Sequence, residues 1–156
     1  TMSAQWVYFC TLPLIIVNKV GADSNLYLSD GIGWTLFAVG WVIEIVADAQ
    51  KTRFKADASN KGKFIRTGLW KLSRHPNYFG EILLWLGIAT SACSVVQRKF
   101  DYLVLLSPFW TFMLLVFMSG IPPSEKTFKR KYKDVDGFQE YMRSTPVLIP
   151  FCFCWR

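Results

Sequence analysis

The sequence predicts an all-α protein embedded in a membrane as a bundle of about four transmembrane helices, with a C-terminal segment on the cytoplasmic or matrix side. Of its 156 residues, 52 % are hydrophobic and 17 % are aromatic. A soluble domain of this size could not bury that much apolar surface. The apolar residues also gather in long runs, and the basic residues gather in the segments between those runs.

Four apolar runs define the predicted helices: Trp6–Val20, Gly31–Ala49, Tyr78–Val96 and Tyr102–Ile121. The last three approach the length of about 20 residues that a helix needs to cross about 30 Å of hydrocarbon. The first run is shorter, which fits a tilted span, a re-entrant segment or the remainder of a longer helix. Tryptophan and tyrosine lie near the ends of the runs, as expected at the two interfaces of a bilayer.

The charges predict the topology. Residues 51–75 contain eight basic residues and a single acid, Asp57, and residues 119–145 are also basic. With four spans, both segments lie on the same side of the membrane, which the positive-inside rule identifies as the cytoplasm or its equivalent. Orientation and contact with anionic lipid headgroups would alone explain this charge. Nucleic acid is excluded as a partner because the basic residues follow the helix ends and form no groove-sized face.

The cysteines do not indicate a metal site. Cys10, Cys93, Cys152 and Cys154 form no Cys-x-x-Cys pair, and His75 is the only histidine. A zinc-finger pattern needs more ligands than this. We therefore interpret the cysteines as small apolar side chains in a reducing compartment, and expect no bound metal.

The second apolar run carries ionisable residues on one face. Glu44, Asp48, Lys51 and Lys55 are spaced i, i+4, i+7 and i+11, which aligns them along one side of a helix. Carboxylates within a membrane helix are costly and usually face a polar cavity or a charged partner. The alternative is a local ion pair between Asp48 and Lys51 at the end of the helix.

The third helix begins with a polar motif, Arg74-His75-Pro76-Asn77. Proline suits the first turn, where its missing N–H would be unpaired in any case. The free N–H groups there, with an arginine and a histidine beside them, form a potential anion site. Glu81 shares a face with Asn77 and offers polar groups to a ligand, unless it merely pairs with a loop lysine. These features predict a polar cavity at the cytoplasmic helix ends, ringed by Lys and Arg, that suits a phosphate-rich nucleotide.

The stretch Trp70–Glu81, WKLSRHPNYFGE, resembles the signature of the steroid 5-alpha-reductase superfamily, and is closest to its broad branch of uncharacterised membrane proteins. The resemblance continues in order through Glu44–Lys55, Asn60–Trp70, Ser119–Pro123 and Tyr141–Pro150. It therefore covers nearly the whole chain, and implies that residues 1–156 form one membrane domain similar to the C-terminal, cofactor-binding part of the family.

The resemblance implies binding of reduced nicotinamide adenine dinucleotide phosphate (NADPH) and hydride transfer to a double bond of a lipid or sterol-like substrate. The proton donor is not identified; Tyr78 and Tyr132 are candidates by chemistry alone. The residues implied for the cofactor would lie along it (Asp48, Lys51, Lys55), near its phosphates or adenine (Arg66, Trp70, Arg74, His75), on its nicotinamide side (Asn77, Tyr78, Glu81) and beneath it (Glu125).

Two alternatives stay open at this point. The isoprenylcysteine carboxyl methyltransferases share the core His75-Pro76-x-Tyr78-x-Gly80 and bind S-adenosylmethionine, although Asn77 and Glu81 resemble the reductases more. The family usually carries further N-terminal helices that supply much of the substrate pocket, and we expect these to be absent. The chain would then be a non-catalytic subunit that contacts other membrane subunits and uses no cofactor. The resemblance is compatible with the endoplasmic reticulum or the mitochondrial inner membrane.

Overall fold

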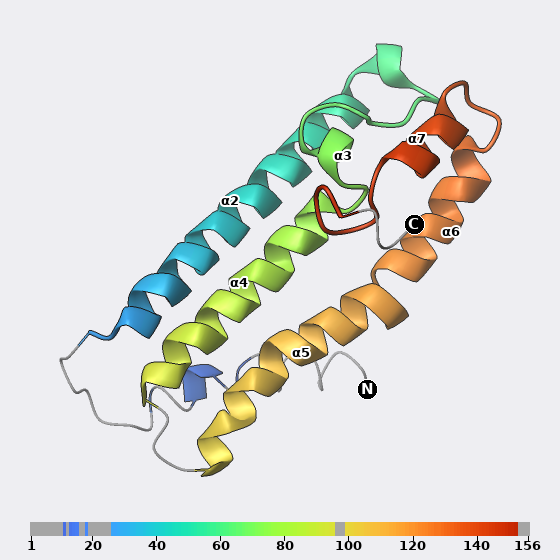
Figure 1. Ribbon diagram of the computed structural model, residues 1–156. Helices are drawn as coiled ribbons and strands as arrows, with labels where there is room; N and C mark the ends of the chain where they lie inside the picture. The colour runs from blue at the N-terminus through green and yellow to red at the C-terminus, as the bar shows by residue number, and fades with distance from the viewer. Residues whose placement is uncertain (1–10, 12, 16–17, 19–25, 96–98, 153–156) are drawn as a thin grey trace.

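The structure is a computed structural model that describes residues 11, 13–15, 18, 26–95 and 99–152. Every regular element in these ranges is a helix, and no strand occurs among them. Three helices run side by side along the molecule (Figure 1): α2 (Leu28–Ala56), α4 (Pro76–Ala92) and α5 (Leu106–Met113). One end holds α3 (Leu69–Leu72), α6 (Ile121–Tyr132) and α7 (Phe138–Ser144). Short segments join them: the 3₁₀ turns η1 (Ala58–Asn60), η2 (Cys93–Val95) and η3 (Lys99–Leu105), and the π-helical η4 (Leu114–Met118).

This architecture confirms the prediction of an all-α membrane bundle. Two helical stretches, Leu28–Ala56 and Tyr102–Tyr132, are long and apolar enough to cross a membrane. Between them, α4 has 17 residues, so it is about 26 Å long at 1.5 Å per residue. Of the four spans expected, the structure thus directly supports two, and the run Trp6–Val20 falls largely outside the described residues.

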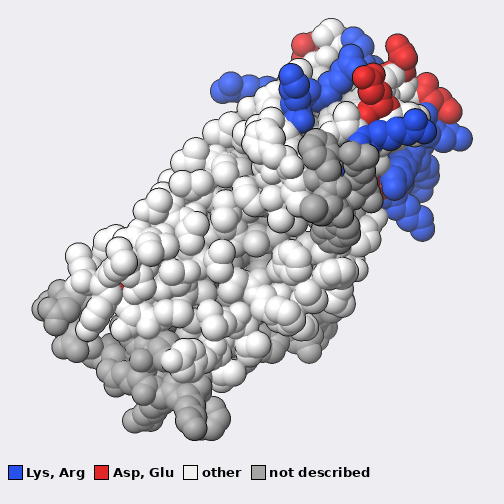
Figure 2. Space-filling view, viewed as in Figure 1, with Lys and Arg blue, Asp and Glu red and all other residues white. Residues whose placement is uncertain are grey.

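The charged residues collect at one end of the molecule. In Figure 2 the Lys, Arg, Asp and Glu side chains crowd around the end that carries α3 and α7, while the long flank is almost free of charge. Large apolar side chains cover the flank of α2, including Trp34, Trp41, Val42 and Ile45, each about half exposed. An apolar flank with one charged end is what a bilayer crossing requires.

The observed helix α2 extends beyond the predicted run, which ended at Ala49. It continues through Lys51, Arg53 and Lys55 to Ala56, because basic side chains in a last turn interact favourably with the negative end of the helix dipole. The predicted fourth helix is also less regular than expected. It changes from η3 to α5 and then to η4, where the N–H groups of Ser119 and Gly120 both donate to the carbonyl of Leu114.

Helices α2 and α4 are antiparallel and touch backbone to backbone at two pairs of glycines. A Cβ atom on Gly40 would lie 2.5 Å from the carbonyl oxygen of Gly80, and one on Gly87 would lie 2.6 Å from that of Gly33. The two glycines of each helix are seven residues apart, or about two turns, so they share one face. Small residues allow close helix approach where the solvent is lipid and cannot drive helices together.

Asp30 holds the opposite end of this helix pair. Its Oδ1 accepts hydrogen bonds from the hydroxyls of Ser91 (3.0 Å) and Ser94 (2.9 Å), and its Oδ2 accepts one from the backbone N–H of Tyr27 (2.9 Å). Asp30 is only 8 % exposed, so these donors are needed to stabilise its charge. The predicted apolar run began only at Gly31, whereas the helix already includes Asp30 in its first turn.

The glycine contacts predict a sharp contrast between two positions in α2. Gly40→Ala forces a methyl group against the backbone of α4 and should destabilise the fold by about 1–3 kcal/mol, as overpacking does. Gly31→Ala is the matched control because nothing lies within 4 Å of a Cβ there. Thermal unfolding in detergent measures both. Equal unfolding temperatures for the two variants would contradict the backbone contact.

Candidate functional site

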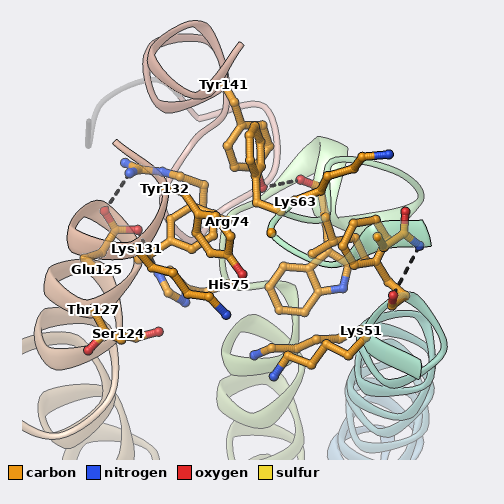
Figure 3. A pocket seen from close by; sticks show the side chains of 18 of the residues that line it. Lys51, Lys63, Arg74, His75, Ser124, Glu125, Thr127, Lys131, Tyr132 and Tyr141 are labelled. Atoms are coloured by element: carbon orange, nitrogen blue, oxygen red, sulfur yellow. Dashed lines mark hydrogen bonds and ion pairs between the residues drawn. The ribbon is translucent and has the colours of Figure 1, made fainter. Parts of the chain in front are cut away.

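A cavity of about 860 Å³ lies at the charged end of the bundle. Its walls come from the end of α2, the loop that follows it, the start of α4, and α6, with Tyr141 of α7 above (Figure 3). This volume falls within the range of about 300–1,000 Å³ that is usual for small-molecule and cofactor sites. The cavity therefore lies where the sequence predicted one.

The cavity brings together most of the predicted cofactor residues. Tyr78 stacks on the imidazole of His75, with ring centroids 5.3 Å apart and planes 5° from parallel. Lys51 reaches in from α2 and lies over the indole of Trp70, 4.9 Å from the ring centroid. The predicted residues in the lining are Lys51, Lys55, Trp70, Arg74, His75, Tyr78 and Glu125.

Four predicted residues do not line the cavity. Asp48 is exposed on α2. Arg66 is exposed, with its guanidinium 6.0 Å from the centroid of the Phe64 ring. Asn77 and Glu81 are partly buried in α4, and Asn77 directly precedes Tyr78 of the lining.

Other residues of the lining were not predicted to bind the cofactor, and Tyr132 was predicted only as a candidate proton donor. Lys61 and Lys63 belong to the basic loop, whose charge by itself predicted only the topology and contact with lipid headgroups. Phe128 and Tyr132 line the wall formed by α6. They follow Glu125 at i+3 and i+7, so the three residues share one face of a helix. That spacing could have predicted both residues once Glu125 was assigned to the cavity.

The carboxylate of Glu125 holds the two polar residues at the start of α4. Its Oε2 accepts a hydrogen bond from Nη1 of Arg74 at 2.7 Å, and its Oε1 lies 3.0 Å from Nε2 of His75. The Arg74 side chain is 4 % exposed and that of Glu125 is 13 % exposed. A buried charge is stable only when it is paired, so this ion pair fixes α6 against α4.

Backbone contacts hold the C-terminal segment against the same residues. The N–H of Arg74 donates to the carbonyl of Pro146 (2.9 Å). The hydroxyl of Ser73, which is fully buried, donates to the carbonyl of Leu148 (2.8 Å) and in turn accepts the N–H of His75 (3.1 Å). The residues just before α4 thus also bind the backbone of the segment that follows α7.

Trp70 links α2, α3 and α7. Its indole N–H donates to the carbonyl of Ala47 (2.9 Å), and its own carbonyl accepts the hydroxyl of Tyr141 (2.7 Å). Burial raises the pKa of Tyr141 far above its usual value, so this hydroxyl stays protonated and remains a donor. Phe64, Phe128 and Phe138 pack around Tyr141 and complete an aromatic cluster.

The donor set favours an anionic, aromatic ligand over a metal. Lysines approach the cavity from three segments: Lys51 and Lys55 on α2, Lys61 and Lys63 in the loop, and Lys131 on α6. No group of three or more potential metal ligands occurs among the described residues. Lysine ammonium groups suit phosphates, and aromatic walls suit a flat ring system.

The fold and the site define a class: a helical membrane protein with a basic, aromatic-walled cavity at one end of its bundle. The chain belongs to the family described as "Protein of unknown function (DUF1295)", whose model matches residues 1–145. Together with the relatives below, this match confirms the predicted membership of the steroid 5-alpha-reductase superfamily.

The relatives include reductases and a methyltransferase. The chain is 29 % identical over 154 residues to 3-oxo-5-alpha-steroid 4-dehydrogenase 1 of Macaca fascicularis, covering 94 % of this chain and 53 % of that protein. It is 28 % identical to steroid 5-alpha-reductase DET2 of Gossypium hirsutum, covering 78 % of this chain and 42 % of that protein. Probable O-methyltransferase ustE of Ustilaginoidea virens is 33 % identical over 92 residues, covering 58 % and 32 %.

The chain spans about half the length, or less, of these curated relatives. No solved structure matches it.

Breaking the buried ion pair should strongly destabilise the fold. Glu125→Ala leaves the Arg74 guanidinium buried without its carboxylate and should cost about 3–5 kcal/mol. Glu140→Ala on α7 is the control, because Glu140 is exposed. Chemical unfolding of the ligand-free protein in detergent measures the difference. Similar stabilities of the two variants would mean that the pair does not hold α6.

Tyr141→Phe should lower the free energy of unfolding by about 1 kcal/mol, because only the hydrogen bond to Trp70 is lost. The folded pKa of Tyr141 is raised, so its contribution is complete below pH ~10, where an unfolded tyrosine begins to ionise, and is lost at higher pH. Unfolding measured from pH 7 to 11 should therefore show a constant gap that narrows above about pH 10. A gap that widens there would contradict the assignment.

Proposed function

We propose that the protein is a membrane-embedded reductase that transfers a hydride from NADPH to a double bond of a lipid or sterol-like substrate. The observation that carries this proposal is the cavity itself, because it combines a rim of lysines with aromatic walls at the end of a membrane bundle. The names of the steroid 4-dehydrogenase and the steroid 5-alpha-reductase among the relatives support the same reaction class. On this proposal, the chain corresponds to the cofactor-binding part of those proteins.

The charge of the lining fits NADPH better than S-adenosylmethionine. A pyrophosphate and a 2′-phosphate are strongly anionic, and the lysines from three segments offer them several point charges. S-adenosylmethionine carries a sulfonium cation, which this rim would repel. Two carboxylates line the cavity, and both already have partners: Glu125 pairs with Arg74, and Asp57 accepts the backbone N–H of Ser59.

A buried acceptor next to the cavity also fits the nicotinamide. The Oδ1 atom of Asn77 is buried and has no hydrogen-bond partner. An unpaired buried acceptor is costly, so a donor on a bound ligand would stabilise the protein. The carboxamide of a nicotinamide carries such a donor.

On this proposal, different residues hold different parts of the cofactor. Lys51, Lys55 and Lys63 would bind the phosphates, and Trp70 would contact the adenine end. Asn77, Tyr78 and Glu81 would orient the nicotinamide side. Bound NADPH would supply the hydride. Asp48 and Arg66 would contribute from outside the lining. Glu125 would act by holding Arg74 and His75 in place.

Two other functions are alternatives to this proposal. The match to a probable O-methyltransferase favours an S-adenosylmethionine enzyme as the second candidate. The third is a non-catalytic subunit of a larger membrane complex, because the exposed apolar flank of α2 is as compatible with packing on partner helices as with lipid. We further propose the endoplasmic reticulum or the mitochondrial inner membrane as the location, with the basic end in the cytoplasm or matrix.

Binding of NADPH to the detergent-solubilised chain tests the cofactor. We expect saturable binding that Lys51→Gln with Lys63→Gln weakens about thirtyfold or more, since each of the two lost charged contacts removes about 1 kcal/mol or more. Lys126→Gln with Arg130→Gln removes the same charge from exposed positions outside the lining and serves as the control. Saturable S-adenosylmethionine binding instead would favour the methyltransferase, and binding of neither would favour the subunit.

Asn77→Ala and Glu81→Ala test the reaction. Both variants should abolish substrate-dependent oxidation of NADPH while the fold, measured by thermal unfolding, is kept. A 3-oxo-steroid with a ring double bond is the first substrate to try, given the printed name of the macaque relative. Full activity in both variants would overturn the assignment of these two residues.

A further inference from the structure

A second, smaller cavity shares Arg74 with the first. Its volume is about 340 Å³, and it is lined by Arg74, Lys129, Lys133, Phe138, Gln139 and Met142. These residues come from the start of α4, the end of α6 and the region of α7. Three of the six lining side chains are cationic, and none is a carboxylate. Apart from Arg74, the lining shares no residue with the larger cavity.

Arg74 has an unused donor. Its side chain is 4 % exposed. Nη1 donates to Glu125 and contacts the sulfur of Met142 at 3.2 Å, but the buried Nε has no hydrogen-bond partner. Buried guanidinium N–H groups are normally satisfied, so an orphaned one in the wall of a cationic cavity points to a missing acceptor.

The two lysines are available to a ligand. Lys129 is 3.9 Å from Glu125 and Lys133 is 3.8 Å from Asp134, and both lysine side chains are more than 60 % exposed. Exposed ion pairs at these distances contribute little and exchange readily for a better partner. The amide of Gln139 adds a further donor, and Phe138 and Met142 supply an apolar wall.

We propose that this smaller cavity is a second binding site that takes a phosphate group, held by Arg74, Lys129 and Lys133. Its volume is too small for a dinucleotide but accommodates a phosphate or phosphomonoester. The site lies at the charged end of the bundle, where lipid headgroups also lie. The phosphate therefore belongs either to an anionic phospholipid headgroup or to a small soluble molecule.

Inorganic phosphate is the first probe. The chain is reconstituted into discs of phosphatidylcholine, and phosphate binding is followed by calorimetric titration. We expect saturable binding that Lys129→Gln with Lys133→Gln weakens about tenfold or more, because charge-assisted contacts are lost. Lys133→Gln alone, which leaves the contact between Lys129 and Glu125 in place, should weaken binding in the same direction.

Two controls separate this site from general positive charge and from the larger cavity. Lys126→Gln with Arg130→Gln removes equal charge from the same helix but from neither lining. Lys51→Gln with Lys63→Gln alters only the larger cavity. Both pairs should leave the phosphate affinity within about twofold. NADPH binding should in turn be unchanged by Lys129→Gln with Lys133→Gln, so the two sites fail or succeed independently.

A second set of discs, containing phosphatidic acid beside phosphatidylcholine, distinguishes the two sources. If the headgroup occupies the site, inorganic phosphate binding is lost in these discs and the unfolding temperature rises only when both lysines are present. Equal phosphate binding in both discs identifies a small soluble phosphate compound. The proposal is overturned if phosphate does not bind and phosphatidic acid does not stabilise the chain, or if the Lys126 and Arg130 pair matters as much as the Lys129 and Lys133 pair.

Discussion

The ion pair between Arg74 and Glu125 is the interaction on which the charged end of the protein depends. Both side chains are largely removed from water, so each charge requires the other. Arg74 directly precedes His75, the N-cap of α4, whereas Glu125 lies 51 residues later on α6. Their contact fixes where α6 crosses the end of the bundle and gives His75 its partner. The walls of both cavities follow from that placement.

The two cavities differ in the charged and polar groups that line them. The larger one has lysines from three segments and aromatic walls, and its carboxylate Glu125 is already paired with Arg74. The smaller one has three cationic side chains and no carboxylate in its lining, and the Arg74 side chain that it shares with the larger one has a donor without an acceptor. Arg74 lies in both walls, so the same guanidinium supports the fold through Glu125 and contributes charge to each space. A membrane protein with few buried charges concentrates several roles on one such residue.

Apolar runs and charge placement predicted the long helical stretches within the described residues and the basic end, because both patterns are local in the sequence. The stripe on α2 likewise led to Lys51 and the motif at the start of α4 to His75, whereas Trp70 was implied only by the family resemblance. The rest depends on tertiary contacts that leave no periodic signal. Whether Asn77 or Glu81 enters a cavity is decided by how α4 rotates against α2. The pairing of Arg74 with Glu125 joins residues 51 positions apart in the sequence, so no local pattern reveals it.

The glycine contacts between α2 and α4 have a consequence for how this fold can change over evolutionary time. At Gly40 and Gly80 the neighbour of each residue is a backbone atom, which is present whatever the partner's side chain is. No second substitution elsewhere can therefore make room for a larger residue there. Positions such as Ile45, which face outward, can exchange among apolar residues freely. Substitutions are therefore constrained more tightly at these glycine contacts than at many polar positions. A new ligand preference can evolve at the charged end without disturbing the glycine contacts.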